Sequence, residues 1–124
     1  MKTFYYLLLI LTPLINYSQT QDGLSFQATT HDFGTLMKGS EAKAKFKFLN
    51  SSSKTIEILK IHGENHCLKI DTSSLKAYAP NEKGVIIAEY DTNCTGPIRK
   101  TLSVFTSLKD NTTTLKLIGE VRSE

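Results

Sequence analysis

Apolar and polar residues alternate along most of the chain after a strongly apolar start. The clearest run spans residues 42–48, in which small or aromatic residues alternate with lysines: Ala42, Ala44, Phe46 and Phe48 against Lys43, Lys45 and Lys47. Successive side chains of a strand point to opposite faces, so this run has one apolar face and one charged face. The pattern predicts a half-buried strand with its phenylalanines in a core and its lysines in solvent.

Shorter runs with the same period recur about every ten residues, which is typical of small all-β domains. Apolar residues that mark these runs are Phe26, Ile56, Leu68, Ile86, Leu102 and Leu115. Turn-forming residues separate the runs, and no long stretch has helical periodicity. At Leu59 the alternation changes phase, which indicates a β-bulge. The chain is therefore predicted to be all-β, folded as a single antiparallel β-sandwich of about seven strands.

The start of the chain has the pattern of a secretory signal peptide. Lys2 gives a positive start, an apolar run spans residues 4–11, and small or polar residues follow it. A retained transmembrane anchor would need about 20 apolar residues, whereas Pro13 interrupts this segment. We expect residues 1–19 to be a cleaved signal peptide and residues 20–124 to form the mature domain.

Composition narrows the classes of function. The chain has 124 residues, of which 40% are hydrophobic, and its formal net charge is +3. This length suits one domain, and the charge is too small to indicate a nucleic-acid partner. The chain contains two cysteines, which excludes a disulfide-dense scaffold and a four-cysteine zinc site.

A motif in the first half of the mature chain carries a family resemblance. The segment His31-Asp32-Phe33-Gly34-Thr35-Leu36 is followed by Gly39 and then by Phe46-Lys47-Phe48-Leu49-Asn50. This order resembles the opening of an immunoglobulin-like domain family of unknown function that is common in exported proteins of Bacteroidetes and is related to Hydin-type domains. The resemblance implies an immunoglobulin-like sandwich in an exported protein. It also implies structural roles for six residues: His31, Asp32, Phe33, Gly34, Gly39 and Asn50.

Two segments depart from the pattern of that family. Many members carry a Cys-Gly-Cys segment where this chain reads Asn65-His66-Cys67, and their Pro-Gly turn reads Pro80-Asn81 here. Any role of a paired-cysteine motif is therefore not carried over to this chain.

Cys67 and Cys94 are left with two alternatives. After export they meet an oxidising compartment, where a disulfide is favoured. The bridge would close a loop of 27 residues and would stabilise the fold by about 3–4 kcal/mol in the chain-entropy model. The other alternative is two separate thiols, because the sequence does not fix the distance between them.

Weak candidates for metal ligands lie in one loop: His62, His66 and Cys67. Imidazole and thiolate are ligands for zinc and copper. Apart from Glu64, no further cysteine pair or carboxylate set completes the site, so a polar surface loop with exposed imidazoles is the simpler explanation. We predict no cofactor and no metal.

Function is predicted only as a class. The sequence has no nucleophile-elbow glycines and no phosphate-binding loop, so we predict no enzyme and nominate no catalytic residue. We expect an exported binding or structural module, in the periplasm or at the cell surface, whose partner is an unknown envelope protein or glycan and which keeps no stable membrane span. The alternative is an accessory protein that handles metal or carbohydrate through the loop from His62 to Cys67.

The charged face formed by Lys43, Lys45 and Lys47 has two explanations. The lysines either contact an anionic partner or only protect the strand from unwanted pairing.

Cleavage of the signal peptide can be tested by mass. Because the apolar run is too short to span a bilayer, the exported protein should begin near Thr20. Intact-mass measurement of the exported protein checks this, and a membrane-embedded species that retains residues 1–19 would contradict it.

Overall fold

Residues 23–108 and 112–123 are described by the computed structural model, so the predicted signal peptide lies outside the described residues. The described chain forms nine strands and one short 3-10 helix: β1 (Leu24–Phe26), β2 (Thr30–Met37), β3 (Lys43–Asn50), β4 (Ile56–His62), β5 (Leu68–Ile70), η2 (Thr72–Ser74), β6 (Ala77–Tyr78), β7 (Lys83–Tyr90), β8 (Gly96–Thr106) and β9 (Thr112–Arg122).

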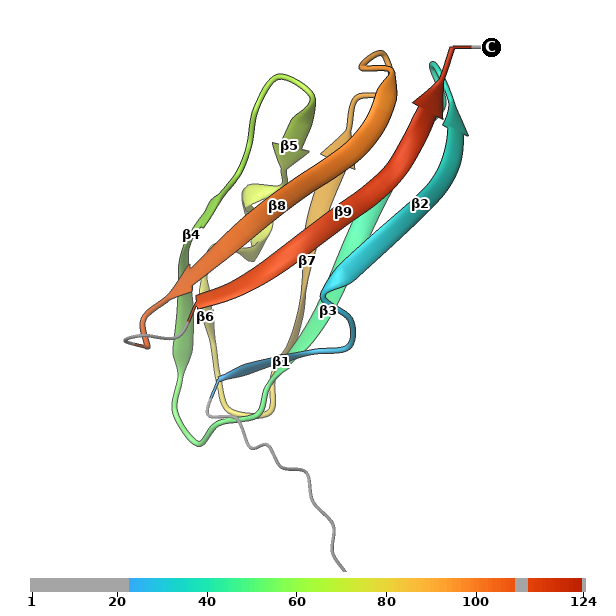
Figure 1. Ribbon diagram of the computed structural model, residues 1–124. Coiled ribbons are helices and arrows are strands. Elements are labelled where there is room, and N and C mark those ends of the chain that lie inside the picture. The colour runs from blue at the N-terminus through green and yellow to red at the C-terminus, as the bar shows by residue number, and fades with distance from the viewer. Residues whose placement is uncertain (1–22, 109–111, 124) are drawn as a thin grey trace, which may run out of the picture.

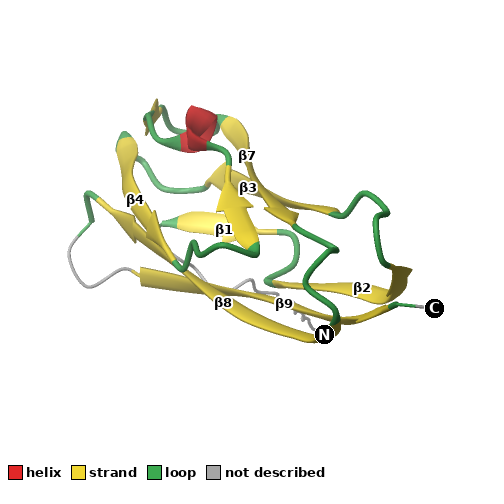
Figure 2. Ribbon diagram, turned by 90° about the horizontal axis from the view of Figure 1, so that it is seen from above, coloured by secondary structure: helices red, strands yellow, loops and turns green. Residues whose placement is uncertain are grey.

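The strands form two sheets that pack face to face as two layers (Figure 2). One sheet has the order β1-β3-β7-β5 and the other has the order β2-β9-β8-β4-β6. The all-β sandwich predicted from the sequence is confirmed. One strand pair differs from the antiparallel expectation, because β2 runs parallel to β9.

The parallel pair arises where the chain changes sheets. β1 pairs with β3 in the first sheet, and after residues 27–29 the chain continues as β2 beside β9 in the second sheet (Figure 1). The last residue of β2 is followed by Lys38, whose N–H donates to the carbonyl oxygen of Arg122 at 2.8 Å. β2 therefore follows β9 to the end of the sandwich.

The alternation in β3 appears in the structure as predicted. Phe46 and Phe48 are 2% and 3% exposed, whereas Lys43, Lys45 and Lys47 are exposed to solvent. The opposite wall of the core comes from the second sheet and includes Ile56, Ile58, Ile98, Leu102, Val104, Leu115 and Leu117.

The bulge expected at Leu59 is also present. The register between β4 and β8 shifts between Ile58 and Lys60, and the Leu59 side chain is 53% exposed. An extra residue in one strand moves the later side chains to the other face. Ile61 is therefore able to pack against the core from a position that a regular strand would turn to solvent.

Close packing at the other end of β3 requires a glycine in β7. A Cβ atom on Gly84 would overlap the rings of Phe48 and Tyr78, whose centroids lie 4.9 Å apart. The Tyr78 hydroxyl donates to the carbonyl oxygen of Ser74 at 2.9 Å. Burial raises the pKa of Tyr78, and the nearby charge of Glu82 adds to the shift.

The two faces of β3 should respond very differently to truncation. Replacing Phe46 by Ala should lower the free energy of unfolding by about 3–5 kcal/mol, because it removes a ring from a close-packed core. Replacing Lys45 by Ala should cost less than about 0.5 kcal/mol, as exposed substitutions do. Urea denaturation of both variants checks this, and equal losses would mean that the face assignment is inverted.

Candidate functional site

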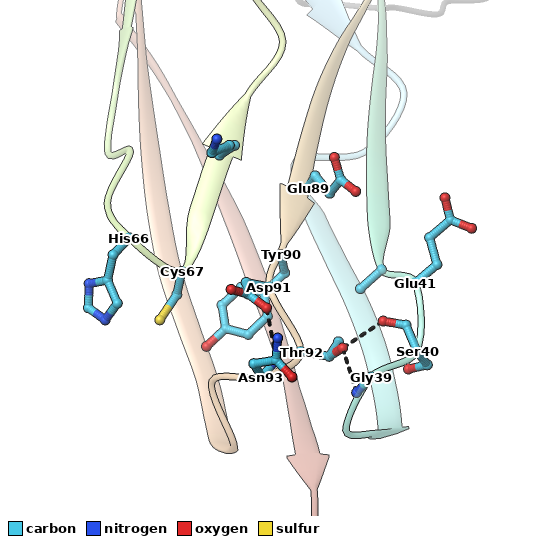
Figure 3. Close-up of a pocket in the computed structure, with 12 residues that line it drawn as sticks. Gly39, Ser40, Glu41, His66, Cys67, Glu89, Tyr90, Asp91, Thr92 and Asn93 are labelled. Atoms are coloured by element: carbon cyan, nitrogen blue, oxygen red, sulfur yellow. Dashed lines mark hydrogen bonds between the residues drawn. The ribbon is translucent and has the colours of Figure 1, made fainter.

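Three loops meet at one end of the sandwich and enclose a pocket. They are residues 38–42 between β2 and β3, residues 63–67 between β4 and β5, and residues 91–95 between β7 and β8 (Figure 1). The pocket has a volume of about 350 Å³, and its walls include Glu41 and His66 (Figure 3). Loops held at the end of a rigid sandwich are a common place for binding residues.

Thr92 fixes the first of these loops to the third. Its side chain is buried, and its hydroxyl accepts a hydrogen bond from the N–H of Gly39 at 3.0 Å and donates one to the carbonyl of Ser40 at 2.6 Å (Figure 3). Gly39 has a φ of +90°, a backbone conformation that glycine adopts without strain. The loop therefore turns sharply and is tied down at its tip.

A disulfide joins the other two loops, which settles the question that the sequence left open. Cys67 and Cys94 are bonded, with their Cα atoms 6.1 Å apart. Hydrogen bonds hold the same segments together: the N–H of Asp91 donates to the carbonyl of Cys67 at 2.7 Å, and the N–H of Cys94 donates to the carbonyl of Asp91 at 2.9 Å. The two cysteines are therefore positioned by the backbone as well as by their bond.

His66 and Cys67 occupy the centre of a tight turn. Asn65 and Leu68 close this turn with two backbone hydrogen bonds of 3.0 and 3.1 Å, and the side-chain oxygen of Asn65 accepts from the N–H of Cys67 at 2.8 Å. The side chains of His66 and Cys67 lie next to each other beside the pocket (Figure 3). The ligand-type atoms of His66, Cys67 and Cys94 all lie within 4.8 Å of one another.

The structure separates the two histidines of the loop that the sequence grouped together. His62 is the last residue of β4, where it pairs with Ser103 of β8. It does not belong to the group formed by His66 and the two cysteines. Cys94 joins this group in its place, although it is 27 residues from Cys67 along the chain.

Charged and polar side chains of both signs line the pocket. Three carboxylates, Glu41, Glu89 and Asp91, share its walls with Lys69. Burial raises the pKa of Tyr90, with the charge of Asp91 as a second cause, so this phenol stays protonated near neutral pH. These residues were not recognisable as a site from the sequence, because they come from separate segments of the chain and share no motif.

The residues of the family motif lie mostly along β2, away from the loop cluster. The carboxylate of Asp32 accepts from the N–H of Gly34 at 2.8 Å, and Gly34 has a φ of +69° at the point where the register with β9 shifts. The rings of His31 and Phe33 meet edge to face with centroids 4.5 Å apart. Phe33 packs against the core but is only partly buried.

Asn50, the last motif residue, joins three segments at the far end of β3. Its side-chain nitrogen donates to the carbonyls of Lys54 and Tyr78 at 2.8 and 2.9 Å, and its side-chain oxygen accepts from the N–H of Ser52 at 3.0 Å. It is fully buried. The side chain of Asn50 therefore holds these segments of the domain together.

A second candidate surface is the edge of β3 that faces away from β7. The N–H of Tyr90 donates to Ala42, and the N–H of Asn50 donates to Glu82. The even-numbered residues of β3 therefore direct their backbone groups to β7, and the odd-numbered residues direct theirs to the other side. Within the described chain, the backbone partners on that other side are β1, opposite residues 48–50, and Gln27, whose N–H donates to Lys47.

The backbone groups of Lys43 and Lys45 consequently form an open strand edge. β1 would cover it if the strand continued past Phe26, but the chain crosses to the second sheet there. At the point of departure lies a groove of about 650 Å³, whose walls include Gln27, Lys47 and Lys83. The open edge and the groove together carry several lysines and face solvent.

Comparison with known proteins places the chain in a family. The family described as protein of unknown function, DUF1573, matches residues 24–121. The chain belongs to the DUF1573 family. The unknown-function family predicted from the motif is thereby supported, while its link to Hydin-type domains stays a prediction. No curated protein matches the sequence.

Solved structures share the fold of this DUF1573 chain at low sequence identity. A protein of unknown function from Porphyromonas gingivalis W83 matches with a TM-score of 0.66 and 15% identity, over 83% of this chain and 50% of that one. The chain thus spans about half the length of that protein. PapD-like domain 7 of human CEP192 matches with a TM-score of 0.65 and 7% identity, over 90% and 96% of the two chains. The CupB2 chaperone of Pseudomonas aeruginosa matches with a TM-score of 0.52 and 13% identity, over 77% and 54%.

These similarities show an immunoglobulin-like fold for the DUF1573 domain. Among residues 23–108 and 112–123, no helix is long and apolar enough to cross a membrane.

The disulfide should contribute strongly to the stability of this DUF1573 domain. Reduction should lower the melting temperature by about 10 °C or more, because the bridge is worth about 3–4 kcal/mol in a domain of this size. The double variant Cys67→Ser/Cys94→Ser should melt at the same lower temperature with or without reductant. Thermal melts followed by circular dichroism check this, and two titratable thiols in the freshly isolated, denatured protein would contradict it.

Proposed function

We propose that this protein is an exported, non-catalytic binding module that takes up an extended protein segment along the open edge of β3. The observation that carries the proposal lies next to the point where β1 leaves the sheet: among the described residues, the backbone groups of Lys43 and Lys45 have no partner on the side away from β7. An extended peptide can add to such an edge as a further strand and gain main-chain hydrogen bonds. Export is supported by the disulfide, since such bonds persist in oxidising compartments.

The edge also defines the chemistry of the segment it fits. Side chains on the outer face of an added strand would lie across from Lys43 and Lys45, so acidic residues suit those positions. Side chains on the inner face would approach the gap between the sheets, where His31 and Phe46 have ring centroids 6.4 Å apart. The expected partner segment therefore alternates acidic and apolar residues.

Lysines on an edge strand can also serve to prevent pairing. The lysines disfavour pairing with neutral or basic strands, but they attract the acidic side chains of an acidic strand. The lysines thus select among partners, as specificity requires. A glycan would use the lysines but would gain nothing from the backbone groups, and this difference makes the proposal testable.

A labelled peptide that alternates glutamate and valine is a suitable probe. Fluorescence polarisation should show it binding more tightly than a peptide that alternates lysine and valine. Lys45→Glu should weaken binding by about tenfold, because it replaces cross-strand attraction by repulsion, a change of about 1–2 kcal/mol. Lys116→Glu is the matched control, since Lys116 is an exposed mid-strand lysine in the other sheet, and it should leave binding unchanged.

Main-chain pairing is tested by removing its hydrogen bonds. Lys45→Pro deletes an N–H that faces the open edge, a position where proline is tolerated in a strand, and it should abolish binding while the melting temperature stays close to that of wild type. In an added strand, every second N–H group of the peptide points to β3. N-methylation of that set of alternate residues should also abolish binding, whereas N-methylation of the other set should not. Two outcomes would show that charge alone attracts the peptide and would overturn the proposal. One is an equal loss of binding for Lys45→Glu and Lys116→Glu, and the other is full binding by both N-methylated peptides.

A further inference from the structure

We infer that His66, Cys67 and Cys94 form a redox-gated site for a zinc-type cation: the disulfide excludes the metal, and the reduced cysteines bind it. The inference is independent of the β3 edge and goes beyond the binding function proposed above. It rests on the three ligand atoms that lie within 4.8 Å of one another. An ion with bonds of about 2.0–2.3 Å to sulfur and nitrogen can reach all three atoms once reduction lets the two bonded sulfurs move apart.

Backbone hydrogen bonds hold the two cysteine loops together independently of the disulfide. The hydrogen bond from the Asp91 N–H to the Cys67 carbonyl, at 2.7 Å, joins the two cysteine loops through the backbone. The 2.9 Å bond from the Cys94 N–H to the Asp91 carbonyl places the second cysteine. Neither bond involves a sulfur atom, so we expect both to remain after reduction.

A tight turn holds His66 beside Cys67. Both residues lie in the turn closed by Asn65 and Leu68, and the Asn65 side chain accepts from the Cys67 N–H. The imidazole ring is exposed, so it can rotate toward an ion at the sulfurs at little cost. Figure 3 shows the ring and the sulfur of Cys67 on the same side of the pocket.

The charge and the number of these ligands suit a zinc-type cation. Two thiolates and one neutral imidazole cancel the charge of a divalent cation, which matters because Cys67 is 8% exposed and burial penalises net charge. Three protein ligands leave the fourth position of a tetrahedral zinc site open. Cys67 and His66 both line the pocket, so a fourth ligand would approach the ion from that side.

Redox state controls the site through a balanced exchange. A dithiol reductant gives two electrons and two protons to the Cys67–Cys94 bond, which becomes two thiols while the dithiol becomes a disulfide. A divalent cation then displaces the two thiol protons and binds the thiolates. Cys67 is buried, whereas Cys94 is partly exposed, so a reductant can approach the disulfide from the Cys94 side.

Zinc alone is the probe for the test. The purified protein is reduced, freed of reductant under anaerobic conditions and titrated with Zn²⁺ in competition with a chromophoric chelator. We expect one Zn²⁺ per reduced chain and none bound competitively by the oxidised chain. His66→Ala should weaken binding by at least about tenfold, because even outer-shell changes at metal sites cost that much. His62→Ala, a histidine of the same region outside the group, should bind as wild type does.

A second measurement separates this site from zinc binding by an unfolded chain. Far-UV circular dichroism of the reduced protein should show the sandwich intact, and Zn²⁺ should slow re-formation of the disulfide in wild type more than in His66→Ala. Equal zinc affinity of the oxidised and reduced forms would overturn the inference. Equal affinity of His66→Ala and His62→Ala would also overturn it, as would loss of the fold on reduction.

Discussion

The passage of the N-terminal chain from one sheet to the other is the constraint on which much of this structure depends. β1 supplies three residues to the edge of β3 and then leaves, because β2 has to close the second sheet beside β9. The crossing brings the His31 and Phe33 rings to the side of the sandwich between the two sheets. Within the described residues, it also leaves Lys43 and Lys45 of β3 without a backbone partner on the side away from β7.

The fold was predictable from the sequence wherever one strand face is buried. The alternation around Phe46 and the change of phase at Leu59 both report local geometry, and both appear in the structure. The parallel pairing of β2 with β9 was not predictable, because those strands are separated by most of the chain and no local pattern records which of them meet.

The candidate site was harder to predict for the same physical reason. Thr92 binds Gly39 across 53 residues of sequence, and Cys94 reaches Cys67 across 27. The sequence contained the correct residue types but could not choose between His62 and His66, which lie in the same stretch. The choice depends on the turn from Asn65 to Leu68, and that turn is defined by backbone hydrogen bonds rather than by composition.

The parallel alignment of β2 and β9 has a mechanical consequence. The beginning of β2 and the end of β9 lie at opposite ends of the same strand pair, with Thr29 bonded to Lys116 at one end and Lys38 bonded to Arg122 at the other. A force that pulls these two ends apart slides the strands along each other and loads all of their hydrogen bonds at once. Bonds loaded together resist far more than bonds peeled one by one, so tension between these two ends meets the combined resistance of the whole β2–β9 pair.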